Sequence, residues 1–177
     1  MKNILMAGAA AVLAVAAGLG GAAAQTQPRV DVKNDWSVFQ SGEQGGKVCW
    51  IVSQPTRTAA FRNGKSVQVR RGDVFLMVSI RPADGVESEV SYLGGYPFKP
   101  GSKVETTVGS DKFSLFTEGE NAWAPSAKED GEIVGAFRRG SSAKLEAVSA
   151  RGTTTVDTFS LSGFTAALEA AVSLCKS

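Results

Sequence analysis

Short apolar stretches separated by turn signals recur along most of the chain after residue 36. The segment 66–70 alternates valine with polar side chains, which predicts a strand with its valines inside and Gln68 and the arginines outside. The segment 74–80 is almost continuously apolar, which predicts a central strand covered on both faces. We expect further strands at 36–39, 48–52, 89–93, 103–108, 112–116, 144–149 and 153–159.

Two turn signals place hairpins within this pattern. Asn63-Gly64 suits a type I′ turn, because both of its central residues take positive φ. Gly109-Ser110 suits a type II′ turn, in which glycine occupies the first central position. Many short strands joined by tight turns predict a mainly β fold, and we expect an antiparallel two-sheet β-sandwich.

Two segments have helical rather than strand spacing. Ile133, Val134 and Phe137 predict a short helix within 127–139. Near the C-terminus, apolar residues recur at i, i+3, i+4, i+7, i+8 and i+11, which predicts an amphipathic helix packed on the sheets. The residues of this apolar stripe are Phe164, Ala167, Leu168, Ala171, Val172 and Cys175.

The first 24 residues have the pattern of a secretory signal peptide. Lys2 precedes a run of small apolar residues, and Ala22-Ala23-Ala24 supplies a cleavage site; a membrane anchor is the alternative, disfavoured by the cleavage site. We expect a mature chain with a flexible polar arm over 25–35 and one domain over 36–177. No later segment is long and apolar enough to span a bilayer.

The chain contains two cysteines, Cys49 and Cys175. In an oxidising compartment, an even pair in a small exported domain predicts one disulfide. Cys175 lies on the apolar stripe of the C-terminal helix, where a bond to a strand residue is possible. We therefore expect a structural disulfide that fastens this helix to the strand around Cys49.

The amino-acid composition excludes several kinds of catalytic and metal-binding site. The chain has 177 residues and no histidine, which excludes Ser-His-Asp and Cys-His nucleophile systems and every histidine-containing metal site. Nineteen Lys and Arg against seventeen Asp and Glu give a net charge of +2, so nucleic acid is not an expected partner. No P-loop, calcium loop or dinucleotide fingerprint occurs, and we expect no metal and no cofactor.

Several stretches of the chain carry a family signature when they are taken together and in order. They are Cys49–Pro55, Arg70–Asp73, Gly94–Phe98, Ala122-Trp123, Ser149–Thr153 and Asp157–Phe164. This set resembles the invasion-associated locus B family of alphaproteobacterial exported proteins, and the resemblance covers essentially the whole mature chain.

The resemblance implies a β-sandwich with an immunoglobulin-like outline, located in the periplasm or associated with the outer envelope. It supplies no catalytic residues, and only the cysteine pair corresponds residue by residue. Some relatives carry another cysteine near the first strand, where this chain has Phe39-Gln40. A second disulfide is therefore not expected.

Charge is distributed unevenly along the chain. Between Arg57 and Arg81 six basic residues face Asp73 alone, whereas between Glu105 and Glu132 seven acidic residues face two lysines. A patch containing Arg70 and Arg71 could bind an anionic envelope polymer or a lipid headgroup. The alternative is that these charges are solvated strand faces and protected sheet edges.

Aromatic residues form a second candidate binding feature. Tyr92, Tyr96 and Phe98 surround two glycines, and Trp123 lies in a loop-like segment. These side chains either form a recognition surface or close the open end of the core.

We predict a non-enzymatic exported module that binds a protein or another envelope component. One alternative is a carboxylate-dependent hydrolase of cell-wall or glycan substrates, for which Glu87 with Glu89 or Glu118 with Glu120 supply candidate pairs. Another alternative is a structural or chaperone-like envelope factor that pairs through an exposed sheet edge.

Overall fold

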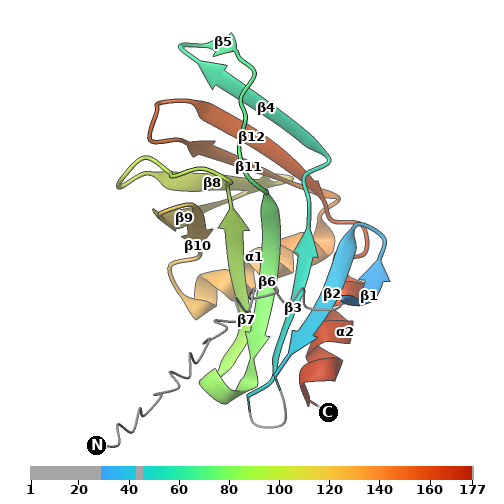
Figure 1. Cartoon of the computed structure of the whole chain (residues 1–177). Helices are drawn as coiled ribbons and strands as arrows, with labels where there is room; N and C mark the ends of the chain where they lie inside the picture. Colours follow the sequence, from blue (N-terminus) through green and yellow to red (C-terminus); the bar gives the residue numbers. More distant parts are fainter. Residues whose placement is uncertain (1–28, 43–45, 177) are drawn as a thin grey trace, which may run out of the picture.

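Twelve strands form one antiparallel sheet in the computed structural model, which describes residues 29–42 and 46–176 (Figure 1). The predicted signal peptide lies outside these residues. The strands are β1 (Arg29–Lys33), β2 (Trp36–Ser41), β3 (Val48–Ser53), β4 (Arg57–Arg62), β5 (Lys65–Ser66), β6 (Phe75–Arg81), β7 (Val86–Leu93), β8 (Lys103–Val108), β9 (Asp111–Glu118), β10 (Asn121–Trp123), β11 (Ser142–Val148) and β12 (Thr154–Ser160).

The expected division into two sheets is wrong, because one short strand joins the halves. The order is β1-β2-β3-β6-β7-β10-β9-β8-β11-β12-β4-β5. Strand β10 pairs with β7 on one side and with β9 on the other, so the hydrogen-bonded ladder is continuous. The result is one open, bent sheet. The short segment 54–56 connects β3, in one half of the sheet, to β4, near the opposite edge.

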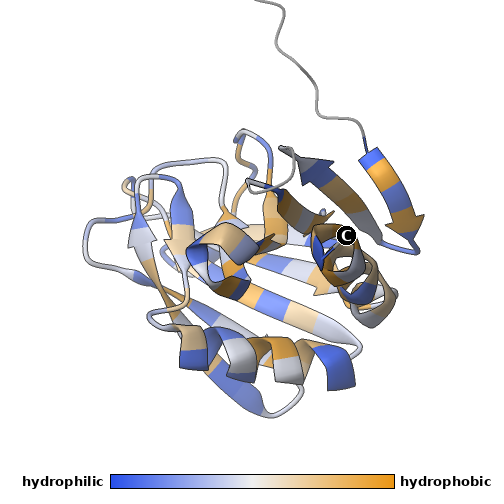
Figure 2. Cartoon of the chain, turned by 90° about the horizontal axis from the view of Figure 1, so that it is seen from below, coloured by the Kyte–Doolittle hydropathy of each residue, from blue (hydrophilic) through white to orange (hydrophobic). Residues whose placement is uncertain are grey.

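The bend brings β7 opposite β12 across the core. The rings of Tyr92 on β7 and Phe159 on β12 meet edge to face with centroids 6.2 Å apart, and both residues are buried. Apolar and polar residues alternate along the strands, as the hydropathy colouring in Figure 2 shows. One face of the sheet therefore supplies the hydrophobic core, as the period-2 pattern requires.

Both predicted hairpin turns are confirmed. Asn63 and Gly64 have φ values of 50° and 74° and connect β4 to β5. Gly109, with φ 58°, begins the two-residue turn between the paired residues Val108 and Asp111.

Three expectations about strands need correction. The strand expected over 66–70 ends at Ser66: the Val67 amide still donates to the Ala60 carbonyl of β4, and residues 68–73 then run to the loop after β7, where the Gly72 amide donates to Gly95. Strand β6 is fully buried on the side of Leu76, Val78 and Ile80 and only half-buried on the other side. Within the arm expected to be flexible, residues 29–33 form β1, which pairs with β2.

The two predicted helices are present as α1 (Ala127–Arg139) and α2 (Phe164–Lys176). Ser126 caps α1, because its hydroxyl accepts a hydrogen bond from the Glu129 amide. Among the described residues, no helix is long and apolar enough to cross a membrane.

Helix α2 packs across β1, β2, β3 and β6 at one end of the sheet. Phe164, its first residue, meets Trp36 of β2 and Phe137 of α1 edge to face, with ring centroids 5.0 and 5.3 Å apart. Gly163 precedes it with φ 88°, and a Cβ there would lie 2.0 Å from the Lys33 carbonyl oxygen. Glycine is therefore required where the β1–β2 turn meets the start of α2.

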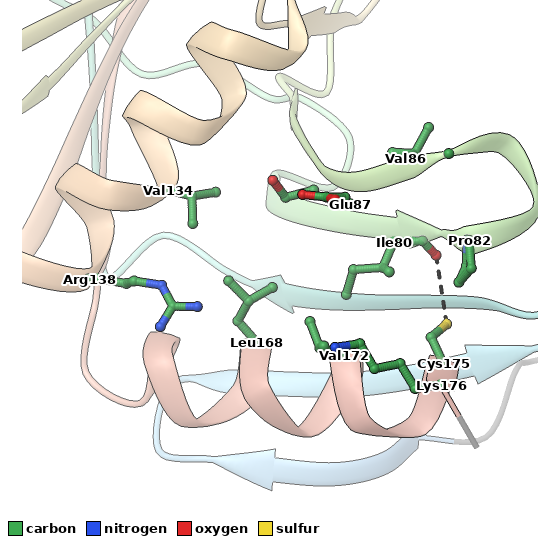
Figure 3. A pocket seen from close by; sticks show the side chains of 12 residues that line it. Ile80, Pro82, Val86, Glu87, Val134, Arg138, Leu168, Val172, Cys175 and Lys176 are labelled. Carbon is green, nitrogen blue, oxygen red and sulfur yellow. Dashed lines mark hydrogen bonds between the residues drawn. The ribbon is translucent and has the colours of Figure 1, made fainter.

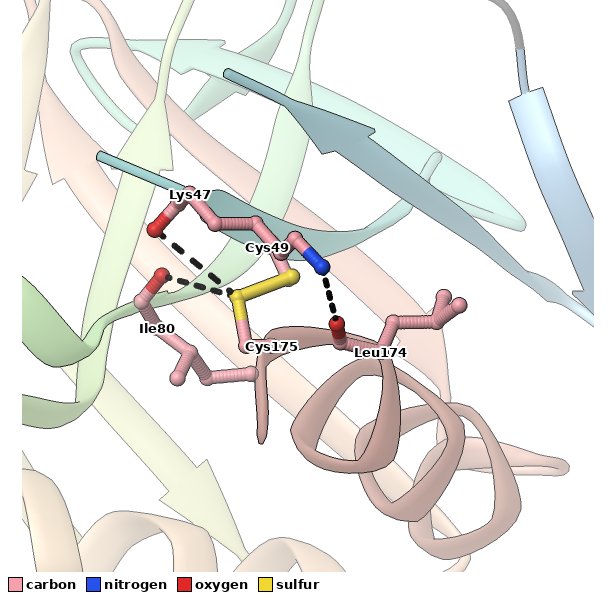
Figure 4. Close-up of a disulfide and its surroundings, with 5 residues drawn as sticks. All are labelled: Lys47, Cys49, Ile80, Leu174 and Cys175. Atoms are coloured by element: carbon pink, nitrogen blue, oxygen red, sulfur yellow. Dashed lines mark hydrogen bonds between the residues drawn. A yellow bond between two sulfur atoms is a disulfide. The ribbon is translucent and has the colours of Figure 1, made fainter. Parts of the chain in front are cut away.

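The predicted disulfide is present and fastens the end of α2 to β3 (Figure 4). Cys49 and Cys175 are bonded with their Cα atoms 5.9 Å apart. Lys47 adds a second link, because its ammonium group donates to the Leu174 carbonyl at 3.2 Å. These two links hold the end of α2, and the packing of Phe164 holds its start.

Candidate functional site

Four arginines line a hollow of about 500 Å³ at the end of the sheet that carries β4 and β5. We call it the arginine hollow. Its walls come from the end of β4, from residues 68–71, from the loop after β7 and from the β11–β12 connection. The residues that matter for its chemistry are Arg62, Arg70, Arg71, Arg151, Tyr96 and Glu120.

Two glycines hold one wall of the arginine hollow in place. The Gly72 amide donates to the Gly95 carbonyl at 2.8 Å, which ties residues 67–73 to the loop after β7. Gly95 has φ 71°, and a Cβ on it would lie 2.6 Å from the Gly72 carbonyl oxygen. Only glycine allows this close approach at position 95, and a Cβ on Gly94 would lie 2.5 Å from the Phe98 ring.

Arg71 is an internal anchor of the hollow. Its guanidinium forms a two-pronged ion pair with Asp157, a fully buried residue of β12, and one of the two bonds measures 2.8 Å. The Tyr92 hydroxyl donates to the same carboxylate at 2.6 Å. Burial disfavours the charged guanidinium, but the hydrogen bonds to Asp157 and the attraction of its charge together outweigh that effect and raise the pKa of Arg71.

Arg71 therefore differs from the exposed ligand group that the sequence predicted. Its side chain is only 11% exposed and its charge is matched by Asp157. Its guanidinium carbon lies 5.9 Å from the centre of the Tyr96 ring, so it also holds that ring against the hollow. Burial raises the pKa of both tyrosines, Tyr92 and Tyr96, which remain neutral hydrogen-bonding groups.

The other three arginines supply the positive charge that a ligand would meet. Arg62 donates two hydrogen bonds to the Thr153 hydroxyl, at 3.1 and 2.7 Å, which fixes its guanidinium at the wall. Arg70 and Arg151 are exposed, and neither forms an ion pair within the described part of the chain. Glu120 is the acidic residue of the lining. The hollow is therefore electropositive.

The structure separates the residues that the sequence grouped as one binding surface. Arg70, Arg71 and Tyr96 line the arginine hollow. Tyr92 and Phe98 are buried core residues, so they do not form a surface. Arg62 belongs to the basic segment that the sequence indicated, but sequence reasoning missed Arg151 as a partner of Arg70, because Arg151 comes from the distant β11–β12 connection.

Trp123 lies instead in a second hollow of about 670 Å³, which we call the acidic hollow. Its ring and the ring of Phe116 have centroids 5.7 Å apart, and Phe116 is 44% exposed. Four carboxylates share this lining, although the described acidic side chains form no group able to hold a metal ion. They are Glu87, Glu89, Glu118 and Asp130.

Two carboxylates of the acidic hollow have pKa values that are shifted in opposite directions. Glu89 accepts two hydrogen bonds from Arg81, at 3.0 and 2.9 Å, which lower its pKa. Burial raises the pKa of Asp130, one oxygen of which accepts from the Val90 amide at 2.7 Å. The predicted pair of Glu118 and Glu120 is divided, because Glu120 lines the arginine hollow.

A third hollow, of about 550 Å³, lies between α1, α2 and the β6–β7 connection (Figure 3). Ile80, Val134, Leu168 and Val172 give it mainly apolar walls. Arg138, at its edge, is engaged by Glu169 at 3.4 Å. This hollow has few converging polar groups, so the arginine hollow is the stronger candidate for specific recognition.

Comparisons with known proteins agree with this architecture. A family model described as Invasion associated locus B (IalB) protein matches residues 36–172. A solved structure, the crystal structure of invasion associated protein B from Bartonella henselae, is similar with a TM-score of 0.57 and 21% sequence identity. The match covers 82% of this chain and 96% of that chain. No curated protein sequence matches the chain.

Proposed function

The chain belongs to the invasion associated locus B family, and from this premise we propose that it is an exported binding protein of the cell envelope. The signal-like pattern of residues 1–24 supports export to the periplasm or the outer envelope. The Cys49–Cys175 disulfide supports an oxidising compartment. The family is not known as a family of enzymes, which supports binding without chemical turnover.

The arginine hollow supports an anionic envelope component as the ligand. Arg70 and Arg151 present guanidinium groups that match phosphate and carboxylate oxygens in a two-pronged geometry. Arg62 lies beside them, already oriented by Thr153. Because the Arg62 guanidinium is already held by Thr153, its part in binding requires little further ordering of that side chain. This convergence of arginines is the observation that carries the proposal.

Binding of a soluble polyanion tests this proposal. The purified mature chain is titrated with polyphosphate, and with polygalacturonate as the carboxylate counterpart, at low and at physiological salt. We expect Arg70→Glu combined with Arg151→Glu to weaken binding by at least about tenfold, and salt to weaken wild-type binding because exposed charges are screened.

A matched control separates this site from net charge alone. Lys128→Glu combined with Lys144→Glu makes the same change in total charge at exposed positions outside the hollow. The control should bind like the wild type. Equal losses in both double variants, or no loss in the first, would contradict the proposal.

We propose carboxylate-dependent glycan hydrolysis as a second candidate function, on one specific observation. Asp130 has a raised pKa and Glu89 a lowered pKa in the same hollow, beside the Phe116–Trp123 pair. Such a division supplies a proton donor and an ionised partner, which glycoside hydrolysis requires. Release of reducing ends from cell-wall glycan that is lost in Asp130→Asn would support it; no release by the wild type would end it.

A further inference from the structure

Residues 61–70 form an exposed, basic end of the molecule, which we call the basic tip. Strand β5 ends the sheet order, and the β4–β5 hairpin lies at the top of Figure 1, away from α2. Within this segment all residues except Val67 are exposed. Between Arg57 and Arg71 the sequence contains no Asp or Glu. The basic tip therefore presents arginine and lysine to the surroundings without internal neutralisation.

Two large apolar side chains are exposed on the basic tip, each followed directly by an arginine. Phe61, which precedes Arg62, is 37% exposed, and Val69, which precedes Arg70, is 39% exposed. Exposed apolar side chains beside basic ones are typical of surfaces that enter the interface of a bilayer. A soluble anion in the arginine hollow would leave the exposure of Phe61 unexplained, since the strand alternation turns Phe61 away from the side of Arg62.

The arginine hollow opens on the same end of the molecule as the basic tip. Arg62, Gln68, Val69 and Arg70 belong to both, so a headgroup in the hollow would lie beside the exposed Val69, while Phe61 projects from the other face of β4 at the same end of the molecule. A lipid phosphate fits the guanidinium groups, and the headgroup layer around it fits Phe61 and Val69. A bilayer therefore accounts for the charged and the apolar groups together.

We propose that the basic tip docks on an anionic phospholipid bilayer. Lipid phosphates enter the arginine hollow, while Phe61 and Val69 insert at the level of the headgroups. This inference rests on the proposed function, because both use the anion-binding capacity of the same hollow.

Vesicle flotation with the purified mature chain tests the inference. Vesicles of phosphatidylcholine alone are compared with vesicles that also contain phosphatidylglycerol. We expect binding only to the second kind, a loss of about fivefold for each of Arg70 and Arg151 when neutralised, and a loss of about tenfold for Phe61→Ser combined with Val69→Ser.

The opposite edge of the sheet offers a matched control. Val30 and Val32 on β1 are also exposed, so Val30→Ser with Val32→Ser removes a comparable apolar area elsewhere. This control should float like the wild type, and unchanged thermal unfolding should show that both double variants are folded. Equal losses in the two double variants would overturn the docking of the basic tip.

The outcomes separate this inference from the proposed function. Binding to soluble polyphosphate without binding to phosphatidylglycerol vesicles overturns membrane docking and leaves the anion site intact, with a glycan or protein as its ligand. Absence of binding to both overturns both proposals. Vesicle binding that resists Phe61→Ser with Val69→Ser overturns the insertion of the tip.

Discussion

At the scale of single residues, the most consequential arrangement is the buried group of Arg71, Asp157 and Tyr92. Asp157 is fully buried and receives hydrogen bonds from both partners. A buried carboxylate is tolerated only when its charge and its lone pairs are satisfied. The group also joins β7, β12 and residues 67–73, so it fixes the wall of the arginine hollow.

Removal of one partner from this group should lower the stability of the fold. We expect Asp157→Ala to lower the free energy of unfolding by about 3–5 kcal/mol, because it leaves the Arg71 charge uncompensated. Tyr92→Phe should cost less, about 1.5–3 kcal/mol, because it removes one hydrogen bond to a charged group. Urea denaturation measures both. A loss below about 1 kcal/mol for Asp157→Ala would show that the ion pair does not hold the fold.

Asp130 and Glu89 should give opposite pH dependences of stability. The pKa of Asp130 is raised above its ordinary value of 3.8, so its contribution is present below pH 3.8 and is lost as pH rises through the folded-state pKa. The pKa of Glu89 is lowered below 4.5, so its contribution is present above pH 4.5 and is lost as pH falls through the folded-state pKa.

Two conservative variants measure these contributions. The stability of the wild type relative to Asp130→Asn should fall as pH rises from 3.8, whereas its stability relative to Glu89→Gln should rise with pH up to 4.5. Denaturation series between pH 3 and 7 give both differences. Slopes of the same sign would contradict the assigned environments.

The roles of individual residues were harder to predict from the sequence than the strands and helices. The chain places Arg70 and Arg71 side by side, and local sequence gives no reason to treat them differently. Arg71 is buried because Asp157, 86 positions away, lies opposite it across the bent sheet. Arg151 likewise joins the site only because the β11–β12 connection lies beside residues 68–71 in the fold. Sequence spacing cannot show such partners.

At the scale of elements, the sequence predicted turns and helices correctly where the structure requires particular residue types at particular positions. Asn63-Gly64 and Gly109-Ser110 form two-residue hairpin turns, and the apolar stripe of α2 faces the sheet as its period requires. The alternating segment 66–70 is a strand only at Ser66, because beyond Val67 the chain is held by the Gly72–Gly95 hydrogen bond and the Arg71–Asp157 ion pair instead of by further ladder pairing with β4.

The disulfide should contribute strongly to the attachment of α2. It closes a loop of 126 residues, so Cys49→Ser combined with Cys175→Ser should lower the free energy of unfolding by about 4–5 kcal/mol on the chain-entropy model. Denaturation of oxidised wild type and of the double variant gives the difference. A loss below about 1 kcal/mol would mean that the packing of the apolar stripe and the Lys47–Leu174 hydrogen bond hold the helix without the disulfide.

At the scale of the whole molecule, a three-residue strand decides the architecture. Strand β10 is too short to stand out in the sequence, yet its pairing with β7 and β9 turns two expected sheets into one. Most strands and their antiparallel pairing were therefore predictable, whereas β1, β4, β10 and the continuity of the sheet were not.

The charges are distributed over the molecule less evenly than the net charge suggests. A net charge of +2 suggests a balanced surface, but the fold gathers arginines in one hollow and carboxylates in another. The two charge-biased segments of the sequence indicated this division. Arg151 joined the arginine hollow, and Glu87 and Glu89 joined the acidic hollow, from outside those segments.

The most direct test of the central claim is to map the binding site residue by residue. Backbone amide resonances of the mature chain are followed by NMR during titration with polyphosphate. We predict that the largest shifts occur at Arg62, Arg70, Tyr96, Arg151 and their neighbours, with the acidic hollow unaffected. Shifts centred on any other surface, or no shifts at saturating polyphosphate, would contradict the assignment of the arginine hollow as the functional site.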